Sequence, residues 1–451
     1  MRSMKLRMMM VLVVTASAHA EPLSRATAVA TALYANVDVR KSQESMSLLE
    51  GRVREARADA LPDVTLFGSG TRYRDPSLLN SSAFDSFPPE LRDALKPVAA
   101  DLYEGTLQVR QTVWSFKLAK AVRAARFGVA FGQEEIRRVQ QAVALETIHA
   151  YNTYLLSLEK VKVTEKSVSL KERHYEMAKN RRAAGVATDL DVLRSGVDLE
   201  NQRAQLERIR GEAGLALGEL NAAMLRPIDD PVEPTDTLAF EPLEVDLAEV
   251  VRAALENRPD MKGASLSEKV YGQFIGVAQA DSRPRIDFTA TWGYSVRKPE
   301  NFFNNDFQKW SAAITVTVPL FDGYRTSGRV AQAVAERAKA HLDLIDLENR
   351  IQLEAKDAVD RLNVASRVLG AAELNVEQAQ KALDLTQANY SHGAATTLDV
   401  MDAQAALTLA ESIRIEALFE HANARATVRY VMGADPLGVR ALSQPAPSTQ
   451  E

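Results

Sequence analysis

The sequence predicts a mostly α-helical protein built from long antiparallel coiled-coil helices, with four short β-strands per chain and an internal two-fold repeat. Three observations lead to this fold class. Two long segments contain no proline and are rich in Ala, Leu, Glu, Gln and Arg, which favour helices. Short segments alternate apolar and polar residues, which is typical of strands. The nine-residue phrase GVATDLDVL at 185–193 returns as GAATTLDVM at 393–401.

The repeated phrase belongs to a longer duplication. ARADALPDV at 56–64 corresponds to AQADSRPRI at 278–286, and LQVRQTVWSF at 107–116 corresponds to ITVTVPLFDG at 314–323. Matching motifs in the same order indicate two copies of one structural unit. We therefore expect the following division of the chain: a first repeat at 21–225, a linker at 226–247, a second repeat at 248–434 and a tail at 435–451.

The first twenty residues have the features of a secretory signal peptide. Lys5 and Arg7 flank a short apolar run, which is followed by the small-residue site Ala18-His19-Ala20. We expect cleavage after Ala20, hence an exported protein. Glu21 stands where a lipoprotein would have cysteine, and the chain contains no cysteine, so we expect neither a lipid anchor nor disulfides.

The long segments at 118–180 and 325–388 predict two unusually long helices. A helix of about 60 residues is about 90 Å long, which suggests a coiled coil or a tube. Each is followed by the glycine phrase and a second helical stretch, at 188–225 or 397–433. The phrase is therefore predicted to be the tip of a helical hairpin.

Within each tip, two residue types have a local structural reason. Gly185 and Gly393 can adopt the left-handed conformation that ends many helices. Thr188 and Thr396 follow three residues later, where a hydroxyl can cap the next helix.

The predicted strands lie between the helical segments. Residues 106–113, 285–294 and 313–320 each place apolar side chains on one face and hydrophilic ones on the other. A soluble sandwich would show the same alternation. Four strands of about ten residues cannot close a barrel alone, so we favour a membrane β-barrel shared among subunits. Trp114, Trp292 and Trp310 lie near strand ends, where an interfacial aromatic belt would be expected, although plain packing explains them equally well.

Composition argues against several other functions. The formal charge is −5, and removing the three signal-peptide cations leaves 52 basic and 60 acidic residues, or −8, which disfavours nucleic acid as a partner. Glu146 and His149 form only half of a di-iron carboxylate motif. We therefore expect no enzymatic activity, no catalytic residues, no metal and no cofactor.

At this point the motifs resemble a known family. VPLFDGYRTSGRV at 318–330 is similar to the strand-to-helix signature of TolC-like outer-membrane efflux proteins, in which the step Phe321-Asp322-Gly323 leads from barrel to helix. The two glycine phrases resemble the periplasmic tip turns of that family. The resemblance implies a homotrimer with a twelve-stranded barrel in outer-membrane lipid and a twelve-helix tunnel in the periplasm.

The resemblance also implies a function and partners. Such a channel gives substrates an exit path, in efflux or type I secretion, and docks through a periplasmic adaptor onto an inner-membrane pump or secretion ATPase. The exposed tips, AATTLDV above all, would meet the adaptor. A competing interpretation is a structural or adaptor protein built on periplasmic coiled coils, although adaptors usually contain a single hairpin.

Two acidic residues are candidates for the selectivity of the tunnel. Asp399 and Asp402 lie one turn apart after the second tip, and threefold symmetry would make each a ring of three carboxylates that attracts cations. Asp399 could equally well cap its helix. The resemblance places Asp402 in a ring that lines the tunnel.

Tyr390 and Asp191 are the candidates for the gate. Asp191 is the first-repeat equivalent of Asp399, whereas Arg194 takes the place of Asp402. By resemblance, Tyr390 would tie adjacent helices, and a bond to Asp191 would hold the entrance closed. The family can place arginine where this chain has Ala395, so one tie is missing. Alternatively, Tyr390 is an ordinary coiled-coil surface aromatic.

Overall fold

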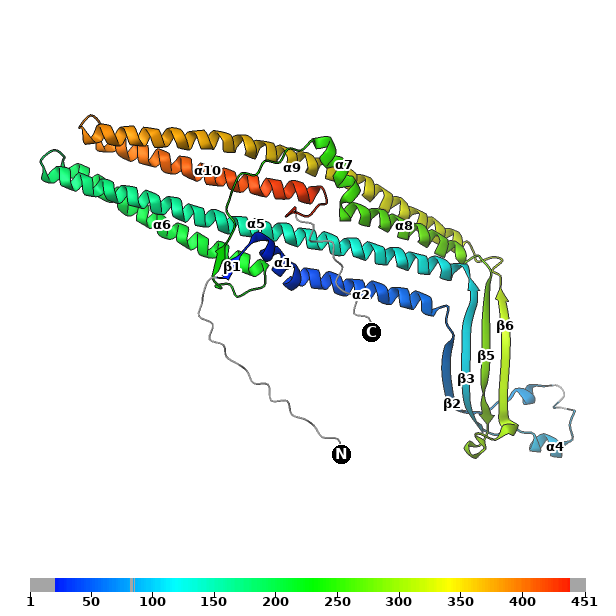
Figure 1. The fold of residues 1–451 in the computed structure, drawn as a ribbon. Helices are drawn as coiled ribbons and strands as arrows, with labels where there is room; N and C mark the ends of the chain where they lie inside the picture. The colour runs from blue at the N-terminus through cyan, green and yellow to red at the C-terminus, as the bar shows by residue number, and fades with distance from the viewer. Residues whose placement is uncertain (1–20, 82–83, 85, 439–451) are drawn as a thin grey trace. The chain divides into compact units, whose positions relative to one another are not determined.

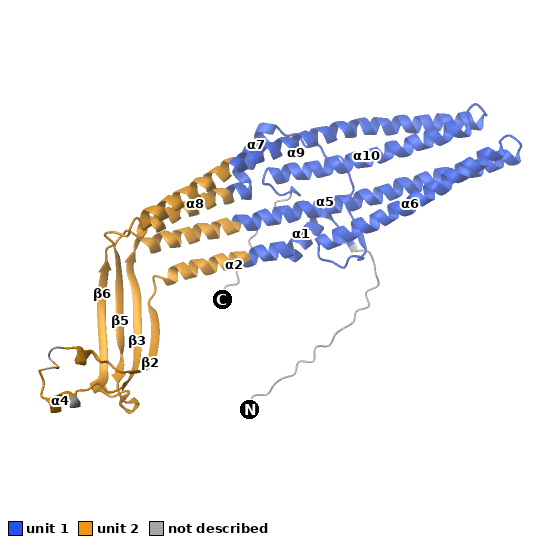
Figure 2. Ribbon diagram, turned by 180° about the vertical axis from the view of Figure 1, so that it is seen from behind, with its two compact units in different colours: residues 1–44, 134–262, 346–451 blue, residues 45–133, 263–345 orange. Residues whose placement is uncertain are grey.

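The helical hairpins and the sheet of the protein are seen in a computed structural model, which describes residues 21–81, 84 and 86–438 (Figure 1). The predicted signal peptide and most of the predicted tail lie outside the described residues. Contacts divide the chain into two compact units, residues 1–44, 134–262 and 346–451, and residues 45–133 and 263–345 (Figure 2). Each unit draws segments from both predicted repeats, because segments far apart in the sequence pack side by side.

The first unit contains the tips of two long hairpins. Helices α5 (Phe116–Ala183) and α6 (Asp189–Ala223) form one hairpin, and α9 (Arg325–Ser391) and α10 (Thr397–Val431) form the other. The two long predicted helices are thus present and extend a few residues further. The shorter elements of this part of the chain are β1 (Glu21–Leu23), α1 (Arg25–Ala35), β4 (Val232–Pro234) and α7 (Leu247–Asn257), and helix α2 (Val37–Ala58) begins here and continues into the second unit.

Each hairpin is held together by apolar packing. In the first, Val168 of α5 packs with Leu199 and Leu206 of α6, and the three form one buried cluster. Ion pairs flank this cluster: Lys171 contacts Asp198 at 2.6 Å. Burial of such side chains contributes about 1.5–3 kcal/mol each, more than an exposed ion pair does.

The linker between the predicted repeats is anchored to the same unit. Its strand β4 pairs in parallel with β1. The buried Tyr151 of α5 donates from its hydroxyl to the carbonyl oxygen of Leu23 at 2.8 Å. Further along, Val250 of α7 packs against Ile351 and Val428 of the second hairpin. Both ends of the linker are therefore fixed by a hydrophobic cluster.

The second unit contains an antiparallel sheet in the order β2-β3-β5-β6 (Figure 1). Its elements are β2 (Asp63–Tyr73), the 3-10 turn η1 (Ser77–Asn80), α4 (Pro89–Ala94), β3 (Ala100–Ser115), α8 (Pro259–Ala280), β5 (Arg285–Val296), η2 (Pro299–Asn301), η3 (Asn305–Phe307) and β6 (Gln308–Thr317).

The register places apolar side chains in rows across the sheet. One row is formed by Leu66, Leu107, Trp292 and Trp310, one residue from each strand. Leu66 is 76% exposed and Trp310 is 74% exposed, so this face is not covered by the rest of the chain. The opposite face is polar, and its neighbouring row is formed by Thr65, Gln108, Thr291 and Ser311. The two-faced strands predicted from alternation are therefore found.

Two strand boundaries differ from the prediction. The segment predicted at 313–320 begins at Gln308 and ends at Thr317, because Pro319 cannot donate to a strand ladder. The segment predicted at 106–113 spans 100–115 and contains a bulge between Thr112 and Trp114. Because a bulge inserts one residue, Trp114 and not Val113 lies opposite Ile286.

No helix within the described ranges is long and apolar enough to cross a membrane.

Candidate functional site

The two hairpin tips have the same local geometry. Gly185 and Gly393 follow α5 and α9 with φ of 79° and 76°, the left-handed conformation that other residues adopt at a cost. The space beside both glycines is open, so the backbone angle is what requires glycine. The amide of Val186 donates to the carbonyl of Arg181 at 2.9 Å, and that of Ala394 to Asn389 at 2.8 Å. These bonds close the helix ends.

Threonine and aspartate then start the next helix at each tip. The Thr188 hydroxyl accepts from the amide of Asp191 at 3.2 Å, and the Asp191 carboxylate accepts from the amide of Thr188 at 2.9 Å. Thr396 and Asp399 repeat this reciprocal pair at 3.2 and 2.7 Å. Both pairs are capping boxes, in which two otherwise free donors are satisfied.

These caps also fix the charge of the two aspartates. Hydrogen bonds from the side chain and backbone of Thr188 lower the pKa of Asp191 below 3.8. Hydrogen bonds from the backbone and side chain of Thr396 do the same for the pKa of Asp399. The carboxylate of Asp399 is therefore ionised and engaged in the cap, which is the alternative role considered for it from the sequence.

Tyr390 is a buried residue between the two hairpins. Only 4% of it is exposed. Arg181 of α5 donates from Nη1 to the carbonyl oxygen of Tyr390 at 2.9 Å, and its guanidinium lies 4.6 Å from the centre of the Tyr390 ring. The ring of His174, also from α5, lies at 5.5 Å. Tyr390 thus packs against the other hairpin.

The expected contact between Tyr390 and Asp191 is made through a third residue. The hydroxyls of Tyr390 and Thr397 lie 3.3 Å apart, and the Thr397 side chain is close enough to Asp191 to lower the pKa of its carboxyl group. An ionised carboxylate only accepts, so the Thr397 hydroxyl can act towards Asp191 only as a donor, which leaves its oxygen to accept from Tyr390. We call this chain of three side chains the tip bridge.

Three residues of this site were missed from the sequence: Arg181, Thr397 and His174. Arg181 lies four residues before Gly185, so its position near a tip was visible, but its target in the other hairpin was not. The family can have an arginine at the position of Ala395, and this chain lacks it. Arg181 of the first hairpin nevertheless places a guanidinium against Tyr390. Thr397 was missed because the adjacent Thr396 accounted for the cap, so no role was sought for the second threonine.

Asp402 lies one turn beyond Asp399 and is exposed. In contrast to Asp399, it takes no part in the cap, so its carboxylate is available to solvent ions. Arg194, the residue at the matching position of the first tip, is also exposed. It lines a groove with Leu193, Val197 and Met401, between α6 and the start of α10. The charge difference between the two tips is therefore at their surface.

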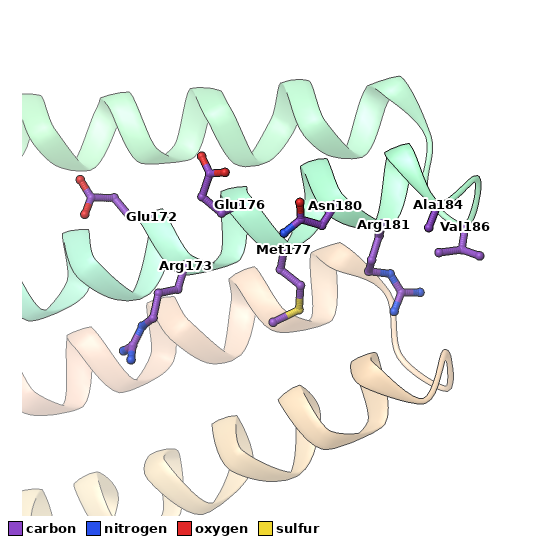
Figure 3. A pocket seen from close by; sticks show the side chains of 8 residues that line it. All are labelled: Glu172, Arg173, Glu176, Met177, Asn180, Arg181, Ala184 and Val186. Carbon is purple, nitrogen blue, oxygen red and sulfur yellow. The ribbon is translucent and has the colours of Figure 1, made fainter.

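The first hairpin presents apolar side chains to solvent near its tip. Val186, Leu190, Leu193 and Val197 are 63%, 54%, 67% and 62% exposed. Met177 is 41% exposed on α5 and lines a shallow groove that runs to Arg181 and Val186 (Figure 3). We refer to these five residues as the tip patch. In the second tip, Leu385, at the position that matches Met177, and Leu398 are similarly exposed, at 67% and 53%.

The strand-to-helix step lies at the other end of α9. Gly323 has φ of 67° and Tyr324 has φ of 63°, so two consecutive residues are left-handed. Asp322 accepts from the amide of Thr326 at 2.8 Å and so caps the first turn of α9. The Phe321 ring packs edge-on against Tyr324 at 5.7 Å. This geometry ends the extended segment and starts the helix.

The model of the family described as outer membrane efflux protein matches residues 28–224 and 250–434. The chain belongs to the outer membrane efflux protein family. The predicted resemblance to TolC-like channels is thereby confirmed, as is the predicted function of an outer-membrane channel that gives substrates an exit path. The competing interpretation as a periplasmic adaptor receives no support.

Named relatives agree with this assignment. The protein is 27% identical to outer membrane protein OprJ of Pseudomonas aeruginosa, covering 83% of this chain and 76% of OprJ. It is 22% identical to the alkaline protease secretion protein AprF of the same organism, covering 74% and 70%. Identity to TolC of Escherichia coli is 22%, with 93% and 85% covered.

Solved structures show the same fold. A structure of CusC superposes with a TM-score of 0.78 at 17% identity, covering 94% of this chain and 96% of CusC. VceC of Vibrio cholerae superposes with a TM-score of 0.76 at 20% identity, covering 91% and 96%. This mostly helical architecture with a small sheet is thus that of known outer-membrane channels.

Proposed function

We propose that this outer membrane efflux protein acts as a homotrimer whose sheets close a twelve-stranded barrel in outer-membrane lipid and whose hairpins form a twelve-helix tunnel. The exposed apolar face of the sheet carries this proposal. Leu66 and Trp310 expose large apolar areas at the two edge strands, β2 and β6. A lone sheet with that face and two open edges is unfavourable in water. Contact with lipid and pairing between subunits remove both problems.

The sequence duplication fits the same assembly. In a trimer, three copies of each tip alternate around the tunnel mouth, so two kinds of hairpin make up one ring. The N-terminal signal peptide would deliver the chain across the inner membrane, with cleavage after Ala20 and without a lipid anchor.

A charged residue on each face of the sheet tests the barrel. We expect Leu66→Arg to abolish most of the heat-resistant trimer in outer-membrane fractions, because arginine facing lipid costs up to about 2–4 kcal/mol, depending on its depth in the membrane. Thr65→Arg, one residue away on the polar face, should leave the trimer intact. Equal loss in both variants, or in neither, would contradict the lipid-facing assignment.

We further propose that the tip bridge holds the tunnel mouth closed. Tyr390 and Thr397 belong to the second hairpin and Asp191 to the first, so the bridge joins the two hairpins at their ends. Arg181 adds a second tie, from the first hairpin to the carbonyl of Tyr390. Widening the mouth by separating the hairpins would break the contact of Thr397 with Asp191 and that of Arg181 with Tyr390 together.

Removal of one hydroxyl from the bridge should favour the open channel. We expect Tyr390→Phe and Thr397→Val each to increase the open fraction about fivefold, the equivalent of one net hydrogen bond of about 1 kcal/mol. Single-channel conductance in planar bilayers measures this change. Tyr34→Phe, which alters a tyrosine that is 82% exposed, is the matched control. Conductance equal to that of the parent in both bridge variants would refute the closure.

Asp402 is proposed to form the ring of carboxylates that attracts cations, with Asp399 contributing mainly as a helix cap. The carboxylate of Asp402 is exposed, whereas that of Asp399 accepts two hydrogen bonds from Thr396. A ring of three charges in a narrow passage concentrates counter-ions.

The reversal potential in a salt gradient tests the two aspartates separately. We expect Asp402→Asn to reduce cation selectivity with little loss of trimer stability. Asp399→Asn should retain most of the selectivity, because asparagine still caps a helix but only the Asp402 ring governs ion passage. If cation selectivity falls with Asp399→Asn and not with Asp402→Asn, the proposal that Asp402 forms the ring is wrong.

The partners are proposed to be a periplasmic adaptor and, through it, an inner-membrane pump or secretion ATPase. The tip turns at Gly185, Thr188, Gly393 and Thr396 would form the rim that meets the adaptor. The exposure of the tip patch favours the first hairpin as the main contact, a shift from the AATTLDV segment expected from the sequence. Apolar side chains gathered at an exposed end are typical of protein contact sites.

A further inference from the structure

His174 is a buried histidine at the back of the Tyr390 site. It is 4% exposed, and its Nε2 atom has no hydrogen-bond partner within the described part of the chain. Such unpartnered buried polar atoms are uncommon, and they are costly when charged. The Tyr390 ring is tilted against the imidazole at 5.5 Å, so the closed tip covers His174.

The charges that face His174 come from three sources. On its own helix, Lys171 disfavours a positive imidazole, and Lys171 is already paired with Asp198 of α6 at 2.6 Å. Asp198 and Asp191, both on α6, favour the positive form. From α9, Tyr390 presents a ring that also contacts the guanidinium of Arg181. Among the residues that the structure describes, α10 adds no charge that shifts the pKa of His174.

We propose that His174 makes the tip bridge acid-sensitive: protonation of the imidazole displaces the Tyr390 ring that covers it and releases the second hairpin from the first. The positive imidazole would require a hydrogen-bond acceptor or water at Nε2, and neither is available while Tyr390 is packed in place. A second cation would also lie near the ring that Arg181 already contacts. This inference rests on the proposed closure by the tip bridge.

The direction of the pH effect follows from the burial. Desolvation by burial lowers the pKa of His174 in the closed tip, an effect that outweighs the charges of Asp198 and Asp191. In an open, solvated tip a histidine titrates near about pH 6.5. The closed tip is therefore fully favoured above that pH, and it loses stability as the pH falls below it, until the lowered pKa of the closed tip is reached. One proton changes the open-to-closed ratio by at most about tenfold per pH unit.

The two capping aspartates of the tips do not titrate in this window. Asp191 and Asp399 have pKa values lowered from 3.8, so both remain charged while His174 changes. A change in conductance between about pH 7.5 and about pH 5.5 is therefore assigned to histidine.

The experiment is single-channel recording of the purified full-length trimer at a fixed salt concentration across that pH range. We expect the open fraction of the parent channel to rise as the pH falls, by up to about tenfold per pH unit for each of the three His174 side chains of the trimer. His174→Gln and His174→Asn should each give a flat profile. The control is His341→Gln, since His341 on α9 is exposed and pairs with Glu268; it should keep the parent profile.

The outcomes separate this inference from the proposed closure. A flat profile for the parent, or a pH response retained in both His174 variants, overturns the role of His174. If Tyr390→Phe opens the channel at about pH 7.5 while the parent profile is flat, the closure stands and only the acid switch fails. If Tyr390→Phe leaves conductance unchanged, the closure itself fails.

Discussion

The tip bridge is the contact that we propose to hold the two hairpins together at their ends. Within each hairpin, apolar clusters such as Val168 with Leu199 hold the helices together. Between the hairpins, an apolar cluster joins Ile148 of α5 to Ala426 of α10, and polar contacts lie closer to the tips: Ser167 and Thr408 are hydrogen-bonded at 3.1 Å, and Lys166 and Glu411 are paired at 2.5 Å. Polar contacts of this kind exchange with water at a small net cost, whereas apolar clusters do not. Each hairpin is thus a stable body, and the joint between the two is the weaker interface.

The sheet imposes a different constraint on the same chain. Its apolar rows are largely exposed, and its first and last strands offer unpaired backbone groups. The helices of the hairpins pair their backbone N–H and C=O groups internally. Only the edge strands of the sheet therefore need backbone hydrogen bonds from another chain. An assembly that closes the sheet with copies of itself would bring six hairpins into one ring.

Much of the fold could be predicted from the sequence because the signals are local. Absence of proline over more than sixty residues predicts long helices, glycine predicts their ends, and alternation predicts the two-faced strands. The bulge at Thr112–Trp114 could not be predicted, because one inserted residue changes the register without changing local composition. The early end of β6 at Thr317 could have been predicted from Pro319, which cannot join the ladder.

The site divides in the same way. The capping role of Thr188 and Thr396 is readable from spacing, since each cap and its aspartate are three residues apart. The partners of Tyr390 are not readable, because Arg181 is 209 residues away and only packing of the hairpins brings it there. Thr397 lies between Tyr390 and Asp191, which were expected to be in direct contact. Its hydroxyl can fill this position because it can accept from one residue and donate to the other.

The most direct test of the account is the distance between the two tips of one chain. The protein has no cysteine, so Ala184→Cys and Ala394→Cys in the tip turns provide unique sites for spin labels, with labelled chains diluted among unlabelled ones. Pulsed electron paramagnetic resonance should show one narrow distance population in the parent, and a broader, longer one when Thr397→Val is added. Identical distance distributions in both proteins would contradict the claim that the tip bridge holds the hairpins together.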